Sequence, residues 1–279
     1  MSNFQLRMIT ASCLIAALVG ILFYLPSFAA PIAFAVIAAC AAWEWGGFMR
    51  QSPSARVLYG LVTLLFCWQI YIFSSQWTPV LLMLSVAFWF IVVPLWLSRK
   101  WTLRGNDFLA YLIGFIVILP TWSAMTYLNK ISPWVLVATM MIVWIADIGA
   151  YFTGRLFGRH KLAPMISPGK TWEGVAGAMI GVAVYGVCLM KWAPLIVTKF
   201  ASNELFSATQ KLGLEALLLL PLLTGISVLG DLFESLLKRQ VGVKDSSALL
   251  PGHGGVLDRI DSLTSTLPFA ALLMYLLSL

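Results

Sequence analysis

The run Phe108-Leu-Ala-Tyr-Leu-Ile-Gly-Phe-Ile-Val-Ile-Leu-Pro-Thr-Trp-Ser-Ala-Met-Thr-Tyr127 decides the fold, because its 20 residues include no charged side chain. An α-helix rises 1.5 Å per residue, so about 20 apolar residues cross the roughly 30 Å hydrocarbon core of a bilayer. Similar runs recur along the whole chain, which is 61% hydrophobic and only 10% charged. An average soluble domain carries about 25% charged residues. A soluble protein with a single anchor is therefore excluded.

We expect an all-α fold, that of a polytopic integral membrane protein with about nine transmembrane helices. Barrel strands would be about 10 residues of alternating polarity, which these long runs do not resemble. The first run follows Arg7 as in a signal peptide, but another apolar run begins almost at once, so we interpret it as a retained helix. The predicted spans are 8–27, 29–49, 57–74, 79–98, 108–127, 133–154, 172–193, 213–237 and 261–279.

Basic residues are distributed unevenly over the two sides of this nine-span arrangement. One side holds 14 of the 18 Lys and Arg residues, and the other has only Lys130, Lys191, Lys199 and Lys211. The positive-inside rule then places the N-terminus and the basic loops in the cytoplasm, and the C-terminus outside. We expect an N-terminal region of about five transmembrane helices, 1–130. A C-terminal catalytic region, 131–279, would follow, with cytoplasmic loops at 154–171 and 238–260.

Acidic residues gather in the second half of the chain, where Asp147, Glu173, Asp231 and Glu234 fall within predicted spans. An ionised carboxylate in hydrocarbon costs several kcal/mol, about 2.5–3.5 on insertion scales, unless it faces a cavity or a partner. This clustering therefore indicates a polar cavity among the C-terminal helices.

Two pairs of carboxylates have the same spacing of three residues. Asp231 and Glu234 share one helix face, with Ser235 a turn beyond Asp231, and Asp258 and Asp261 repeat the spacing. Oxygen ligands of this kind suit Mg²⁺, which is often shared with substrate phosphates. The alternative is simple ion pairing, of Glu234 with Lys238 and of Asp258 with Arg259.

The segment between the two pairs combines glycines with bases. It contains Lys238, Arg239, Lys244, Asp245, His253, Gly254, Gly255 and Arg259. Glycine lets a backbone approach a ligand closely, and Lys and Arg supply charges for anionic oxygens. The pattern predicts a metal–phosphate substrate, although a tight interfacial loop is an alternative. His253 is interpreted either as a phosphate or proton-transfer group or as a structural hydrogen-bonding residue.

A second polar loop, Ser167-Pro-Gly-Lys-Thr-Trp-Glu-Gly174, precedes the seventh span. Either Ser167 or Thr171 is placed to cap that helix, which is the purely structural interpretation. Lys170 lies near the helix N-terminus, a favourable place for an anion, and we expect it to bind nucleotide phosphates. No GxxxxGK[ST] motif is present, which disfavours a P-loop ATPase.

The segment from Ser235 to Asp261 resembles the signature of the phosphatidate cytidylyltransferases, also called CDP-diacylglycerol synthases. It reads Ser-Leu-Leu-Lys-Arg, then four residues, then Lys-Asp-Ser-Ser-Ala-Leu-Leu-Pro-Gly-His-Gly-Gly-Val-Leu-Asp-Arg-Ile-Asp. Residues 167–174 resemble a second family segment, whereas the first 130 residues match only as hydrophobic spans. The resemblance implies transfer of CMP from CTP to phosphatidate, with CDP-diacylglycerol and pyrophosphate as products. It also implies a divalent cation, Mg²⁺ or Mn²⁺, at Asp231 and Asp258, with Asp261 the next candidate ligand.

We therefore expect in-line attack by a phosphatidate oxygen on the α-phosphorus of CTP, since no residue stands out as a covalent nucleophile. The expected catalytic residues are Asp231, Asp258, Asp261, Lys238, Arg239 and His253. The expected substrate-binding residues are Asp147, Ser167, Lys170, Ser235, Lys244, Asp245, Gly254, Gly255 and Arg259.

Besides CTP and phosphatidate, the expected partner is the lipid bilayer of a bacterial inner membrane. A homodimer is possible, and no nucleic acid is expected. The active site would face the cytoplasm. Two alternatives are a transporter, whose carboxylates should lie deep and be related by repeats, and an enzyme that uses another nucleotide or a polyprenyl lipid.

Overall fold

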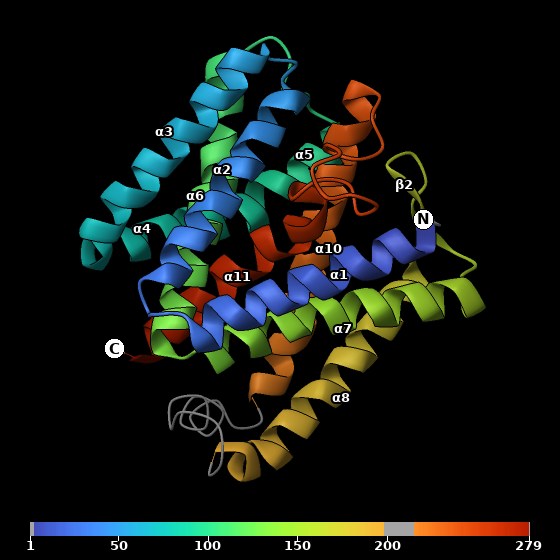
Figure 1. Ribbon diagram of the computed structural model, residues 1–279. Helices are drawn as coiled ribbons and strands as arrows, with labels where there is room; N and C mark the ends of the chain where they lie inside the picture. The colour runs from blue at the N-terminus through green and yellow to red at the C-terminus, as the bar shows by residue number, and fades with distance from the viewer. Residues whose placement is uncertain (1–2, 198–214, 279) are drawn as a thin grey trace.

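The computed structural model describes residues 3–197 and 215–278 of the chain. The predictions for Lys199, Lys211 and the outer ends of the eighth and ninth spans lie outside these ranges. Helices dominate the described residues (Figure 1). In chain order the elements are α1 (Asn3–Val19), the π-helical η1 (Gly20–Tyr24), α2 (Ala29–Phe48), α3 (Pro53–Ile72), α4 (Ser74–Ala87), the π-helical η2 (Phe88–Val92), α5 (Val93–Arg99), α6 (Asp107–Ile131), α7 (Pro133–Phe157), β1 (Lys161–Ala163), β2 (Ser167–Thr171), α8 (Trp172–Val197), α10 (Glu215–Val241) and α11 (Leu257–Ser278).

Within the described residues, nine helical segments are long and apolar enough to cross a membrane, which confirms the predicted polytopic all-α fold. The fourth span is built from three consecutive pieces, α4, η2 and α5. One predicted loop contains a feature that the helical patterns missed. β1 and β2 form a small antiparallel hairpin between α7 and α8.

Helix starts follow local capping chemistry. The Ser52 hydroxyl accepts from the Ala55 amide at the start of α3, and the Asn106 side chain accepts from the Leu109 amide at the start of α6. The ninth predicted span begins four residues too late, because α11 starts at Leu257 rather than at position 261. Its start depends on a residue far away in the sequence, described below.

The core joins the two halves of the chain. Phe233 of α10 is 2% exposed and packs against Trp45 of α2, Trp89 of η2 and Trp96 of α5, with ring centroids 5.6–6.3 Å apart. Burying large aromatic side chains is strongly favourable and fixes the relative positions of the helices that carry them. The predicted boundary near residue 130 therefore does not separate two cores.

α7 and α8 approach each other at glycines (Figure 1). A methyl group at Gly149 would lie 2.9 Å from the Gly177 carbonyl oxygen, and one at Gly174 would lie 3.0 Å from the Ala150 carbonyl oxygen. Small residues of this kind let helix backbones come into direct contact within a membrane. The two helices therefore form one tightly packed pair on which the hairpin is mounted.

Basic loops from both halves meet at one end of the bundle. The Arg50 guanidinium donates to the Val241 carbonyl at 3.4 Å, and that of Arg104 donates to the Gln240 carbonyl at 3.2 Å. Lys130 lies in the last turn of α6, at the end of that helix opposite Arg104. These contacts agree with the predicted grouping of basic segments on one side.

Candidate active site

A cavity of about 560 Å³ lies where α7, α8 and α10 meet the hairpin. It brings together four of the predicted substrate or metal residues, Asp147, Ser167, Lys170 and Asp231. These four residues come from three separate elements, so the fold rather than the local sequence assembles the cavity. Its lining also includes Ser227 of α10, one turn before Asp231.

Lys170 and Asp231 form the central charge pair of this cavity. The Lys170 Nζ atom lies 2.5 Å from Asp231 Oδ2, and the side chains are 22% and 31% exposed. The Ser235 hydroxyl donates to the other oxygen, Oδ1, at 3.2 Å. The predicted Asp231–Ser235 proximity is thus confirmed. The cationic hairpin residue sits directly on the carboxylate that was predicted to bind a metal.

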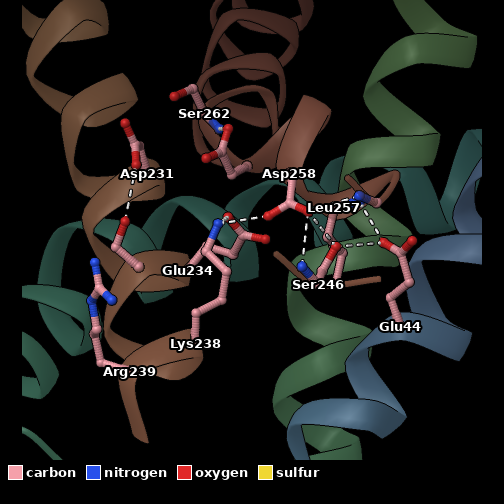
Figure 2. Close-up of polar contacts among 12 residues, drawn as sticks. Glu44, Asp231, Glu234, Lys238, Arg239, Ser246, Leu257, Asp258 and Ser262 are labelled. Carbon is pink, nitrogen blue, oxygen red and sulfur yellow. Dashed lines mark hydrogen bonds and ion pairs between the residues drawn. The ribbon is translucent and has the colours of Figure 1, made fainter. Parts of the chain in front are cut away.

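A second charge cluster lies deeper, around Lys238 (Figure 2). Its ammonium group lies 2.6 Å from Glu234 Oε2 and 2.6 Å from Asp258 Oδ1, and all three side chains are at most 14% exposed. The ion pair expected between Glu234 and Lys238 is confirmed. The alternative pairing of Asp258 with Arg259 is wrong, because the Asp258 carboxylate turns inward to Lys238.

Asp258 has further partners on the signature loop, residues 242–256. Its second oxygen, Oδ2, accepts from the Ser246 amide at 2.8 Å, the Ser246 hydroxyl at 2.9 Å and the Gly255 amide at 2.8 Å. Carboxylates that accept several backbone N–H groups are held in one orientation. Asp258 therefore fastens the loop to α10, and a metal ion there would have to displace Lys238 or these amides.

Glu44 of α2 is the functional-site residue that the sequence interpretation missed. It is fully buried, with 0% exposure, and Figure 2 shows it facing the signature loop. Its carboxylate lies 3.0 Å from the Ser246 hydroxyl, which it shares with Asp258. It accepts from the Ser247 hydroxyl at 2.5 Å, the Val256 amide at 2.9 Å and the Leu257 amide at 2.7 Å. The last two are free N–H groups at the start of α11, where negative charge is favourable.

The capping by Glu44 explains why α11 begins earlier than predicted. Two of its otherwise unpaired amides are satisfied by a side chain more than 200 residues away in sequence. The signal available from sequence was a single carboxylate inside the second apolar run, since such a residue requires a buried partner.

A second cavity, of about 650 Å³, opens on the outer side of the signature loop. It is lined by the predicted residues Lys244, Asp245, His253, Gly254 and Arg259, and by Arg7 of α1. The predicted site is therefore divided between two cavities, and neither is lined by a residue of the Lys238 cluster.

The remaining predicted residues have more varied positions. Arg239 donates to the Ile166 carbonyl at 3.4 Å and so connects α10 to the hairpin. A methyl group at Gly255 would clash with both Ser246 and Glu44, so this glycine is required for packing. At the hairpin, the Thr171 hydroxyl accepts from the Gly174 amide at 3.1 Å, which confirms Thr171 as the helix cap.

Two carboxylates, Asp147 and Asp231, line the first cavity, and a third, Asp261, lies close to Asp231. Asp147 and Asp261 each lie close enough to Asp231 for electrostatic repulsion, and Lys170 and Arg259 interact favourably with Asp147. Within residues 3–197 and 215–278, no group of three or more His, Cys, Asp or Glu side chains is arranged to hold a metal ion. Asp231 is the carboxylate best suited to a cation, because it already holds the Lys170 ammonium group and is partly exposed to the cavity.

Comparison with known proteins gives a match over nearly the whole chain. Residues 5–277 match the cytidylyltransferase family. A phosphatidate cytidylyltransferase of Pseudomonas aeruginosa is 37% identical over 275 residues, which cover 96% of each chain. One from Haemophilus influenzae is 37% identical over 94% of this chain and 96% of its own. One from Brucella suis is 44% identical over 135 residues, 48% of this chain and 43% of its own.

Proposed function

The chain belongs to the cytidylyltransferase family, and we propose that it transfers CMP from CTP to phosphatidate, giving CDP-diacylglycerol and pyrophosphate. The observation that carries the proposal is the cavity in which Lys170 and Asp231 meet beside Asp147. It places a cation and two carboxylates together among the helices of a membrane bundle. The full-length similarity to two phosphatidate cytidylyltransferases supports the same reaction.

In this reaction an oxygen of the phosphatidate phosphate attacks the α-phosphorus of CTP. A new P–O bond forms as the bond between the α-phosphorus and the oxygen bridging to the β-phosphorus breaks, and pyrophosphate leaves with that electron pair. Both substrates are anionic, so catalysis consists mainly of positioning the phosphates and neutralising their charge. A phosphate oxygen is already ionised near neutral pH, so the attacking group requires no general base.

We assign the charge-neutralising roles to bases of the two cavities. Lys170 contacts phosphate in the first cavity, where an ion pair with the substrate replaces its ion pair with Asp231. Lys244, His253 and Arg259 contact phosphate in the outer cavity. Lys238 instead holds Glu234 and Asp258 together, so we propose that it positions the loop.

A divalent cation, Mg²⁺ or Mn²⁺, would be held by Asp231, with Asp261 as a further carboxylate close to it. Such an ion would supply positive charge that offsets the repulsion between the two anionic substrates. Asp258 is less suitable than Asp231, because its carboxylate is only 4% exposed and is held by Lys238 and the signature loop, whereas that of Asp231 is 31% exposed and lines the first cavity.

We further propose that the site faces the cytoplasm of a bacterial inner membrane. The basic loops that meet at this end of the bundle are the segments that the positive-inside rule retains in the cytoplasm. CTP is a cytoplasmic nucleotide, so a site at this end is accessible to it. Whether the chain forms a homodimer stays a prediction.

The test is pyrophosphate release by the purified protein in detergent–lipid micelles with CTP, phosphatidate and Mg²⁺. We expect release that requires both substrates, and a fall of roughly 100-fold or more in Asp231→Asn, in line with losses of single electrostatic groups at active sites. Asp107→Asn is the matched control, because it removes an exposed carboxylate at the start of α6. If no pyrophosphate is released with CTP or with any other nucleotide and lipid tested, the proposal that the protein is an enzyme is refuted. The transporter alternative would then have to be considered again.

A further inference from the structure

The N-terminal helix α1 contributes a base to the outer cavity. Arg7 lines this cavity together with Lys244, His253 and Arg259 of the signature segment, which lies at the other end of the chain. The proposed function assigns phosphate binding to the three residues of the signature segment. Arg7 belongs to the part of the sequence in which we identified only hydrophobic spans.

Direct contacts hold α1 against the signature loop. The Thr10 hydroxyl oxygen lies 2.9 Å from the Pro251 carbonyl oxygen, with a second contact at 2.9 Å within its own helix. Gly252 has φ +77°, and a methyl group there would lie 3.1 Å from Arg7 Cγ. The tip of the loop is therefore a glycine that lets the Arg7 side chain lie directly over it.

The outer cavity has a net positive charge. Arg7, Lys244 and Arg259 line it with Asp245 as the single acidic lining residue, and none of these three bases has an ion-pair partner in the part of the chain that the structure describes. The His253 Nδ1 atom is buried there and has no hydrogen-bond partner among the described residues. A buried polar atom without a partner is uncommon and indicates a ligand or an ion.

We propose that Arg7 is a substrate-binding residue that, with Lys244, His253 and Arg259, completes a site for a phosphate group. Three bases and an imidazole nitrogen without a hydrogen-bond partner among the described residues line this cavity. They suit a phosphate ligand, which carries several negative charges, better than a carboxylate ligand, which carries one. The planar guanidinium of arginine forms paired hydrogen bonds to phosphate oxygens, which an ammonium group does not. The site takes either the polyphosphate of CTP or the phosphate of the lipid, because both present the same terminal chemistry.

The inference rests on the proposed function. Two measurements distinguish a failure of the inference from a failure of the proposed function. The first is the KM for CTP and for phosphatidate in Arg7→Gln, compared with Arg99→Gln, which removes an exposed arginine from the same end of the bundle. We expect KM for one substrate to rise roughly tenfold in Arg7→Gln and neither to change in Arg99→Gln, since hydrogen bonds to charged groups are worth more than a factor of ten. The substrate affected identifies the phosphate that binds. Arg7→Lys should recover only part of the loss.

The second measurement is equilibrium binding of pyrophosphate to the detergent-solubilised protein by calorimetry. Arg7→Gln should lower the affinity for pyrophosphate roughly tenfold. Thr10→Val should also lower this affinity, because the substitution removes the contact between α1 and Pro251. Unchanged KM values together with unchanged pyrophosphate affinity in Arg7→Gln would overturn the inference while leaving the proposed reaction in place. If the wild type turned over neither substrate, the reaction would fail, and pyrophosphate binding would still test the phosphate site.

Discussion

Replacing Glu44 with glutamine should loosen the signature loop without unfolding the bundle. The carboxylate accepts from the Ser247 hydroxyl and from the amides of Val256 and Leu257, and it shares the Ser246 hydroxyl with Asp258. A glutamine side chain keeps one acceptor oxygen and turns an NH₂ group toward the other donors. Each buried donor left without a partner costs about 1–3 kcal/mol, so one unpaired amide and one lost charge-assisted bond amount to roughly 2–4 kcal/mol.

This cost should appear as faster hydrogen exchange in a defined segment. Loop opening exposes the Val256 and Leu257 amides, and each 1.4 kcal/mol changes the open population about tenfold, so exchange should accelerate roughly 30- to 1,000-fold. The measurement is hydrogen–deuterium exchange with mass spectrometry on peptides that cover 246–258, in detergent micelles. Peptides from the C-terminal part of α3, where Ile70 lines a separate cavity with Lys130, should exchange as in the wild type.

Ser247→Ala is the matched control, because it removes one of the four donors and leaves the carboxylate in place. Its expected cost is about 1 kcal/mol, which corresponds to roughly fivefold faster exchange. Equal exchange of 246–258 in Glu44→Gln and the wild type would refute the anchoring role. Acceleration spread evenly over all helices would show instead that Glu44 acts through global stability.

Three further outcomes follow from the charge clusters and the loop. Lys238→Met leaves Glu234 and Asp258 buried without their cation and should cost about 3–5 kcal/mol, seen as a lower unfolding temperature in detergent; an unchanged temperature would contradict the bridging role. Gly255→Ala places a methyl group against Glu44 and should lower kcat and loop protection together, whereas full activity would show that the loop has room. Chelation of divalent ions should abolish pyrophosphate release and added Mg²⁺ should restore it; activity that survives exhaustive chelation would exclude the proposed cation.

Much of the fold follows from the length and polarity of apolar runs, because a bilayer sets how many residues a helix needs to cross it. The sequence could not place the start of α11, since the group that caps it is on α2 and no local pattern connects Glu44 with Leu257. The hairpin was missed for a similar reason. Its strands are three and five residues long, too short for an alternating pattern to be visible.

Part of the site was also predictable. The expectation of one polar cavity among the C-terminal helices is confirmed for Asp147 and Asp231, which line the same cavity, whereas Glu173 pairs with His160 and Glu234 pairs with Lys238 outside it. Residue spacing identified Asp231 and Asp258 as an acidic group but not their different surroundings. Asp231 faces the cavity and Asp258 faces Lys238 and the loop amides, a distinction that only tertiary packing creates.

The glycine contacts between α7 and α8 have a consequence for biogenesis. Consecutive helices whose backbones touch are suited to enter the bilayer as a pair, before α10 has been synthesised. Asp147 would then be inserted beside Lys170 of the adjoining hairpin, which interacts favourably with it. The insertion machinery would thus meet a partly neutralised carboxylate, and Asp231 would encounter its lysine already in position when α10 arrives.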